Sequence, residues 1–369
     1  MLAAHLVLSL LILALGCFAP GFFFVRRLGW TPMEKLCAAV GLSLVLLFLA
    51  GWMVYATRLP WTPSAVAISV ACAALLVAAW GDVRRLFAAP RVRQTSTAFG
   101  WLLLWTLTML ATIRHYSGAG WGGDWLEHFQ RTLVYLSHLP SGSEIFGGWR
   151  IPSRPPLAHI VTAIVMAQTQ DAFEIYQFVF VFLNLIVFLP CCLLLSQLAR
   201  PWKFGILPLA AIFALSPVMM VNATYAGAKS FAAFFVVTAV ALYLRGWKKR
   251  DPMRMAAAFV CAAGGVVAHY SAIPYALFLG LHYLIAVFPG RTQRLKELAS
   301  IAGAAAVPLL AWFGWCIATF GFAGSFMPAV NTSVGYKYDA QESYLLKTRA
   351  NLFDAIVPHP LRDWALVQA

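Results

Sequence analysis

The sequence has few charged residues. Asp, Glu, Lys and Arg make up only 11% of its 369 residues, whereas soluble proteins have about 25%. Hydrophobic residues make up 62%, and the mean hydropathy is +0.77. No large polar domain fits beside so much apolar sequence. The composition therefore excludes a soluble enzyme and indicates an integral membrane protein.

The sequence also lacks clusters of metal-ligating residues. Its seven cysteines lie inside apolar segments, with no CxxC or Cys/His spacing that would hold a metal. No convincing Asp-x-Asp motif is present. We therefore predict no metal or cofactor, and a requirement for a divalent ion stays open.

Acidic residues are scarce beside basic ones, with 13 Asp and Glu against 27 Lys and Arg and a net charge of +14. The basic residues gather in short clusters between apolar runs, which is typical of cytoplasmic loops and not of a nucleic-acid-binding groove. We expect no nucleic-acid partner. Five clusters are assigned to the cytoplasmic face: Arg26, Arg27 and Lys35; Arg84, Arg85, Arg91 and Arg93; Arg200 and Lys203; Arg245, Lys248, Lys249, Arg250 and Arg254; Arg291, Arg294 and Lys296.

The apolar runs predict an all-α, polytopic bundle of about 10–11 membrane helices, since a spanning helix needs roughly 20 apolar residues. No basic segment precedes the first run, and Arg26 and Arg27 follow it, which predicts an extracytoplasmic N-terminus and an uncleaved first span. The predicted spans are 4–25, 36–57, 63–81, 98–114, 174–198, 204–221, 229–244, 255–269, 272–288 and 298–320.

A weaker run, 157–168, leaves one ambiguity in the number of crossings. An odd number of crossings must separate the external loop before it from the Arg200/Lys203 cluster. Because the run is too short for a straight span, we favour a re-entrant or interfacial helix there. A break at Pro190 that splits the segment 174–198 is the alternative.

The longest polar stretch, 115–156, is predicted to be an external loop that contains an amphipathic helix on the membrane surface. Its polar side carries Asp124 and Glu127, and its other side is apolar. Asp followed by Glu three residues later has the form of a capping box. Alternatively, a carboxylate at this surface serves as a general base for an acceptor hydroxyl or amine. Both roles stay open.

Basic and aromatic side chains stand at the outer ends of several predicted helices. The loop ends with Arg150 and Arg154, which either contact lipid headgroups or hold the phosphate of a lipid-linked substrate. Lys229 opens an apolar run, where its charge gains nothing from the helix dipole. Either a bound anion supplies a partner, or the lysine extends to the lipid headgroups. His269 and Tyr270 form the turn between two further runs, where a structural role is the alternative.

The order of these features resembles the GT-C superfamily of polytopic membrane glycosyltransferases, particularly bacterial relatives of the protein mannosyltransferases. The resemblance covers roughly residues 98–290, and its weight comes from the order of motifs that are each weak alone. The matching segments are Asp124 and Glu127 in the acidic position of the loop, Arg154-Pro155-Pro156-Leu157 at the loop exit, Leu215-Ser216-Pro217, and Ala268-His269-Tyr270.

The resemblance implies an inverting transfer of sugar from a polyprenyl-phosphate-linked donor to an acceptor glycan, lipid or protein. The reaction would take place on the extracytoplasmic face of a bacterial inner membrane, among membrane lipids. Glu127 or Asp124 would activate the acceptor. The residues that would hold the donor phosphate are Arg150, Arg154, Lys229, His269 and Tyr270.

The sequence departs from the family at both ends. We divide it into N-terminal helices of unknown role (1–97), a GT-C-like core (98–320) that includes the loop 115–156, and an extracytoplasmic tail (321–369). Three predicted spans precede the core helix where many members have one, and relatives usually continue beyond the tail. A truncated gene product is an alternative.

Two other functions are compatible with these residues. A transporter or flippase of a lipid-linked or amphipathic solute would use the same cations without chemistry. Against it, the sequence shows neither an internal repeat nor paired broken helices in matching halves, which many transporters have. A polysaccharide polymerase or ligase would share the external cations and depend less on an acidic residue in the loop.

Overall fold

Helices make up almost the whole of the structure. The computed structural model describes residues 1–113, 121–143, 145, 149–198 and 205–334; for 121–124 and 329–334 it describes the helical backbone alone. Over these residues no strand forms, and a single β-bridge joins Ile145 to Trp149. The predicted all-α class is therefore confirmed.

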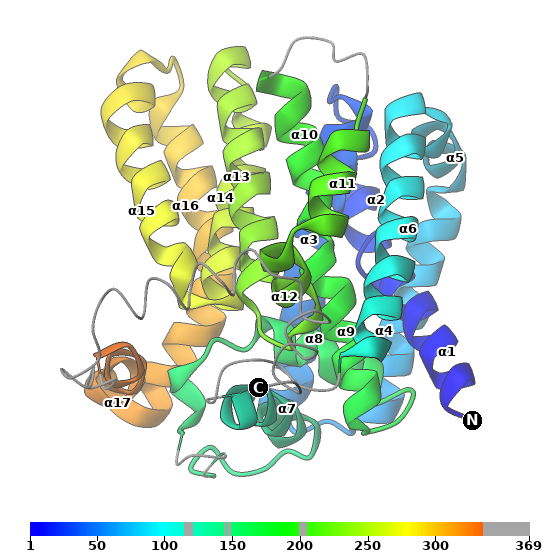
Figure 1. Cartoon of the computed structure of the whole chain (residues 1–369). Helices are drawn as coiled ribbons and strands as arrows, with labels where there is room; N and C mark the ends of the chain where they lie inside the picture. Colours follow the sequence, from blue (N-terminus) through cyan, green and yellow to red (C-terminus); the bar gives the residue numbers. More distant parts are fainter. Residues whose placement is uncertain (114–120, 144, 146–148, 199–204, 335–369) are drawn as a thin grey trace, which may run out of the picture.

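Most of the helices stand side by side in an upright bundle (Figure 1). The first six are α1 (Leu2–Gly16), α2 (Ala19–Val25), α3 (Pro32–Ala56), α4 (Trp61–Ala78), α5 (Trp80–Ala88) and α6 (Pro90–Thr112). Next come α7 (Trp121–Leu136), the 3-10 turn η2 (Ile151–Ser153), α8 (Leu157–Met166), α9 (Phe173–Leu185), α10 (Phe188–Leu198), α11 (Leu207–Leu215) and α12 (Pro217–Thr224). The last are α13 (Lys229–Lys249), α14 (Pro252–Ala268), η3 (Tyr270–Ala272), α15 (Ile273–His282), α16 (Arg294–Leu309) and α17 (Trp315–Val334).

Seven of the described helices are long and apolar enough to cross a membrane, or eight if the bent pair α11 and α12 forms one span. Several helices can thus span a bilayer, as expected of a multi-pass membrane protein. Ten spans were expected. Eight of the ten predicted spans match these seven helices and the bent pair. The remaining two do not: 98–114 falls in α6, which is not among the seven, and 255–269 falls in α14, a shorter apolar helix. α17 continues beyond the predicted end at 320, with a kink at Gly321.

The ambiguity near residue 157 is resolved by the length of α8. Its ten residues span about 15 Å at 1.5 Å per residue, half of the roughly 30 Å hydrocarbon core. All ten are buried, so α8 is a short helix inside the protein and does not lie at an interface with the membrane.

The segment 173–198 forms a single candidate span, although two residues interrupt it between α9 and α10. Pro190 lacks the N–H that would bond to the carbonyl of Ile186, four residues earlier, so the interruption falls one turn before the proline. The alternative of two crossings split at Pro190 is therefore not supported.

Close approach of helices in the core depends on small residues. A Cβ added to Gly264 of α14 would lie 2.7 Å from Cε1 of Phe235 on α13, and one on Gly41 of α3 would lie 2.8 Å from Sγ of Cys261. In a membrane, the hydrophobic effect does not drive helices together, and they associate by close packing at small residues such as these. They bring α3, α13 and α14 together at the centre of the bundle.

Three of the segments that carry basic clusters meet at one end of the bundle. Nε of Arg254, at the start of α14, lies 3.2 Å from Oε1 of Glu34, at the start of α3. Nη2 of Arg291 donates to the carbonyl of Gly246 at 3.0 Å, which joins the segment before α16 to the end of α13. α7 lies at the opposite end (Figure 1).

Candidate functional site

Helix α7 lies across the end of the bundle and buries its charged side. Figure 1 shows it crosswise to the upright helices, and it packs against α8. Glu127, Arg131 and Tyr135 recur along one side and are at most 1% exposed. On the other side, Phe129 packs on Tyr176 of α9 with ring centroids 5.2 Å apart. The amphipathic pattern predicts a surface helix, and the structure shows in addition that its charged side faces into the protein.

Glu127 and Arg131 form a buried ion pair that holds η2 against α7. Nη2 of Arg131 donates to Oε1 of Glu127 at 2.5 Å and to Oγ of Ser153 at 2.9 Å. Nη1 of Arg131 donates to the carbonyl of Ile151 at 2.6 Å. A buried charge is tolerated when it is paired and hydrogen-bonded in this way. The loop exit is thereby fixed to the surface helix.

Arg154 approaches the same carboxylate from η2. Its Nη2 lies 3.8 Å from Oε2 of Glu127, and the Arg154 side chain is 21% exposed. Oε2 of Glu127 is buried and has no hydrogen-bond partner among the described residues. Glu127 thus joins one fully buried arginine to one that is partly open to the outside.

Behind this ion pair lies a stack of two buried histidines. Nδ1 of His128 is 3.2 Å from Nε2 of His159, and Nδ1 of His159 is 3.0 Å from Oγ1 of Thr132. Burial, the facing His159 ring and the charge of Arg131 lower the pKa of His128 well below its usual value. His128 is therefore neutral, and the stack adds no positive charge to the site.

His269 lies in the turn after α14, which packs against the same loop exit. The backbone N–H of Ser271 donates to Nδ1 of His269 at 3.1 Å. Since Nδ1 accepts, the neutral ring carries its proton on Nε2. Burial and the nearby charges of Arg154 and Lys229 lower the pKa of His269 to about 4. His269 is thus a neutral N–H donor beside two cations.

Lys229 and Tyr270 differ in their surroundings: the lysine is exposed, and the tyrosine is hydrogen-bonded to η2. Lys229 is exposed and is the first residue of α13, as predicted. The hydroxyl of Tyr270 donates to the carbonyl of Pro152 at 2.9 Å and accepts from the indole of Trp312 at 3.2 Å. Its hydroxyl therefore joins the turn to η2, and Tyr270 holds the two segments in register.

Two of the predicted site residues stand apart from this cluster. Arg150 is exposed and makes no ion pair with the described residues, although its carbonyl accepts from Oγ of Ser153 at 2.8 Å. Asp124 lies in the first turn of α7, which begins at Trp121, and its side chain is outside the described part of the chain. The capping role of Asp124 therefore stays a prediction.

The structure adds residues that the sequence did not single out as site residues. Arg131 stands four residues after Glu127, and this spacing on a helix is a signal for an ion pair. Ser153 and His159 carry no such signal, because their partners on α7 are distant in the sequence. No group of three or more His, Cys, Asp or Glu that could hold a metal occurs among the described residues.

No family model matches the chain, and no curated protein and no solved structure matches it.

Proposed function

We propose that this protein is a membrane glycosyltransferase of the GT-C type, which transfers a sugar from a polyprenyl-phosphate donor to an acceptor at the α7 end of the bundle. The observation that carries the proposal is the placement of Arg154, 3.8 Å from the buried Glu127 and close to the turn of His269, whose pKa the charges of Arg154 and Lys229 lower. These residues lie on η2, α13, the α14–η3 turn and α7, which are distant in the sequence.

The charge of the grouping supports a phosphate ligand. Lys229 and Arg154 together outweigh the one carboxylate, part of whose charge already neutralises Arg131. A guanidinium offers a two-pronged donor to phosphate, and an ammonium offers a point charge. His269 adds a neutral Nε2–H, which donates a hydrogen bond without further repulsion. A phosphate bound here would balance the excess positive charge.

The proposed reaction is a single displacement. The acceptor hydroxyl attacks the anomeric carbon, the bond from that carbon to the phosphate oxygen breaks, and a carboxylate takes the hydroxyl proton. The leaving polyprenyl phosphate keeps the bonding electrons, and Arg154 and Lys229 stabilise its charge. Attack from the side opposite the phosphate inverts the anomeric configuration.

Of the two acidic residues, we assign the proton transfer to Asp124. A base must come within hydrogen-bond reach of the acceptor. Glu127 is 1% exposed, and its Oε1 is bonded to Arg131, so an acceptor cannot reach it while this pair is intact. We therefore propose Glu127 as a positioning residue for Arg131 and Arg154. Asp124 lies one turn nearer the start of α7.

A transporter of a lipid-linked solute is the second candidate. It is favoured by the 71° bend between α11 and α12, a broken span of the type that transporters use. Transporters usually have two such broken spans, one in each half of the chain. The described residues contain only one broken span, formed by α11 and α12. The transferase hypothesis gives a role to the buried Glu127 and to its two arginines. The transporter hypothesis, which rests on the bent span, gives them none.

The experiment is a transfer assay with purified protein in proteoliposomes. A panel of radiolabelled polyprenyl-phosphate sugars is incubated with an extract of cell-envelope acceptors, and covalently bound label is separated from intact donor. The transferase predicts labelled acceptor together with free polyprenyl phosphate for at least one donor. Movement of intact donor between leaflets without any covalent product would support the transporter and contradict the transferase.

A further inference from the structure

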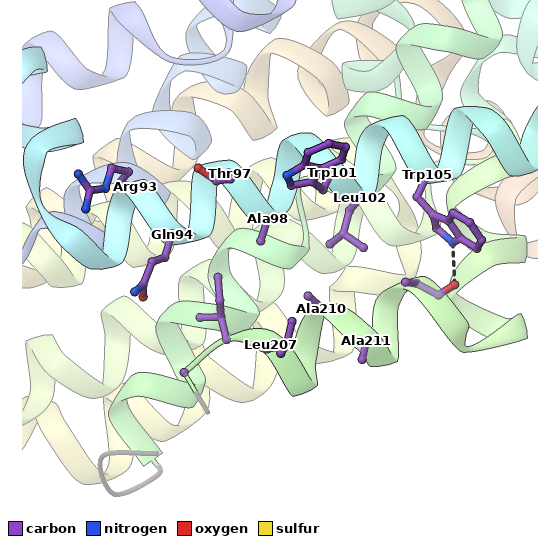
Figure 2. A pocket seen from close by; sticks show the side chains of 13 residues that line it. Arg93, Gln94, Thr97, Ala98, Trp101, Leu102, Trp105, Leu207, Ala210 and Ala211 are labelled. Carbon is purple, nitrogen blue, oxygen red and sulfur yellow. Dashed lines mark hydrogen bonds between the residues drawn. The ribbon is translucent and has the colours of Figure 1, made fainter. Parts of the chain in front are cut away.

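An apolar groove of about 900 Å³ runs along the outside of the bundle between α6 and α11. Figure 2 shows Ala98 and Leu102 of α6 facing Leu207 and Ala210 of α11 across it, and Trp101 of α6 also lines it. None of these residues belongs to the site at α7. The groove is therefore a separate feature of the surface.

The groove is open to the surroundings of the bundle. Trp101 is 67% exposed and Leu207 is 70% exposed. α6 packs along α9, which belongs to a candidate span, so these side chains face outwards from the membrane-crossing part of the bundle. In a bilayer, an outward apolar groove at this level is in contact with lipid chains.

A hydrogen bond between α6 and α11 closes one end of the groove. Its acceptor is a carbonyl group next to the bend between α11 and α12. The chain leaves the helical conformation at Ser216, where Pro217 follows, so the carbonyls in the last turn of α11 lose their partners. The indole N–H of Trp105 donates to the carbonyl of Ala214 at 2.9 Å, as the dashed line in Figure 2 shows. This contact ties α6 to α11 at the bend.

The other end carries positive charge. Arg93 and Gln94 line the groove near the start of α6 (Figure 2), at the end of the bundle opposite α7. Arg93 is exposed, and its side chain makes no ion pair or hydrogen bond with the described residues. Among the described residues that line the groove, Arg93 alone is charged, and it lies at this end of a mostly apolar lining. This arrangement suits a ligand with an anionic head and an apolar tail.

The length of the groove matches one leaflet. From Arg93 to Trp105, α6 rises about 18 Å at 1.5 Å per residue, and half of a hydrocarbon core is about 15 Å thick. We propose that the groove binds one acyl chain of an anionic phospholipid, whose phosphate pairs with Arg93. This site does not depend on the proposed sugar transfer.

The test measures quenching of Trp101 by brominated phospholipids, because bromine on an acyl chain quenches an indole that it touches. The protein is reconstituted in phosphatidylcholine nanodiscs that contain brominated phosphatidylglycerol or brominated phosphatidylcholine at equal mole fraction. The contribution of Trp101 is the difference between the protein and Trp101→Phe. We expect quenching by the anionic lipid at about fivefold lower mole fraction, the size expected for one basic residue beside anionic lipid.

Arg93→Gln should remove this preference. Arg91→Gln, a neighbouring exposed arginine of α6 that does not line the groove, should keep it. Ala211→Phe, which fills the groove, should reduce quenching of Trp101 by both lipids. Equal quenching of Trp101 by the two lipids in the unaltered protein would overturn the proposal. An equal loss of preference in the Arg91 and Arg93 variants would also overturn it, because the attraction would then be diffuse.

Discussion

Nη2 of Arg131 donates to Oε1 of Glu127 across one turn of α7 at 2.5 Å, and neither side chain is more than 1% exposed. Arg131 also bonds to η2, so this pair connects the surface helix to the chain that leads into α8. The pair therefore contributes both to the stability of the loop and to the position of Arg154.

Removing one partner of this pair should destabilise the protein strongly. Glu127→Ala leaves the guanidinium of Arg131 buried without its carboxylate, which typically costs about 3–5 kcal/mol. We expect a loss of this size in the free energy of unfolding, measured by denaturant titration in detergent. The double variant Glu127→Leu/Arg131→Leu should be less destabilised than the sum of its single variants.

The pair between Arg85 and Asp82 on α5 serves as the control. It has the same kind of atoms at 2.6 Å, but the Arg85 side chain is 81% exposed. Arg85→Gln should therefore cost less than about 1 kcal/mol. Equal losses for Glu127→Ala and Arg85→Gln would show that the pair on α7 is not buried as described.

The stability of the protein should fall in weak acid partly because of His269. Burial and the charges of Arg154 and Lys229 lower its pKa from 6.5 to about 4. Since the unfolded chain then binds more protons than the folded one, His269 lowers the free energy of unfolding as pH falls from about 6.5 to about 4. Above this window the contribution of His269 is constant.

His269→Gln should flatten this part of the stability profile. The measurement is the midpoint of thermal unfolding at a series of pH values, compared between this variant and the unaltered protein. An unchanged slope in His269→Gln would be inconsistent with the lowered pKa.

The close packing of α8 against α3 depends on Gly51. A Cβ at this position would lie 2.6 Å from Cγ2 of Ile160, and this methyl stands next to the backbone of α8, so it cannot move away cheaply. Gly51→Ala should cost about 1–3 kcal/mol through overpacking. It should also shift His159, which α8 carries.

Gly100 of α6 provides the matched change, because a Cβ there meets nothing within 4 Å. Gly100→Ala should stabilise the helix by about 0.5–1 kcal/mol. Opposite signs in the two unfolding experiments are expected. Tolerance of Gly51→Ala would mean that α3 and α8 are less closely packed.

The phosphate site predicts different effects for basic residues that are close in the sequence. Arg154→Gln and Lys229→Gln should each weaken binding of polyprenyl phosphate by about 10- to 150-fold, since a hydrogen bond to a charged group is worth about 1.5–3 kcal/mol. Arg150→Gln should have little effect, because Arg150 lies outside the cluster. Titration in nanodiscs measures all three affinities. Equal weakening by all three would indicate surface attraction without a defined site.

Several elements of the fold are visible in the sequence. The start of a helix at Lys229 and of another at Leu157 follow from the change from polar to apolar residues, and the structure confirms both. The helix over 121–136 follows from its amphipathic pattern. These features are predictable because each depends on residues that are neighbours along the chain.

The burial of the charged side of α7 could not be predicted in this way. An amphipathic pattern shows which residues share a face, and it does not show whether that face meets water or other polar groups of the protein. The partners of Arg131 on η2 lie 20 and 22 residues away. The interruption at 186–187 was likewise displaced from Pro190, because a proline disrupts the turn that precedes it.

The most direct measurement is the rate of release of free polyprenyl phosphate from a polyprenyl-phosphate sugar by the purified protein, in the presence of acceptor. Asp124→Asn is compared with Asp171→Asn, an exposed acidic residue between α8 and α9. We predict that Asp124→Asn abolishes release while Asp171→Asn keeps the rate of the unaltered protein. An undiminished rate in Asp124→Asn, or absence of release with every donor, would contradict the proposed transfer.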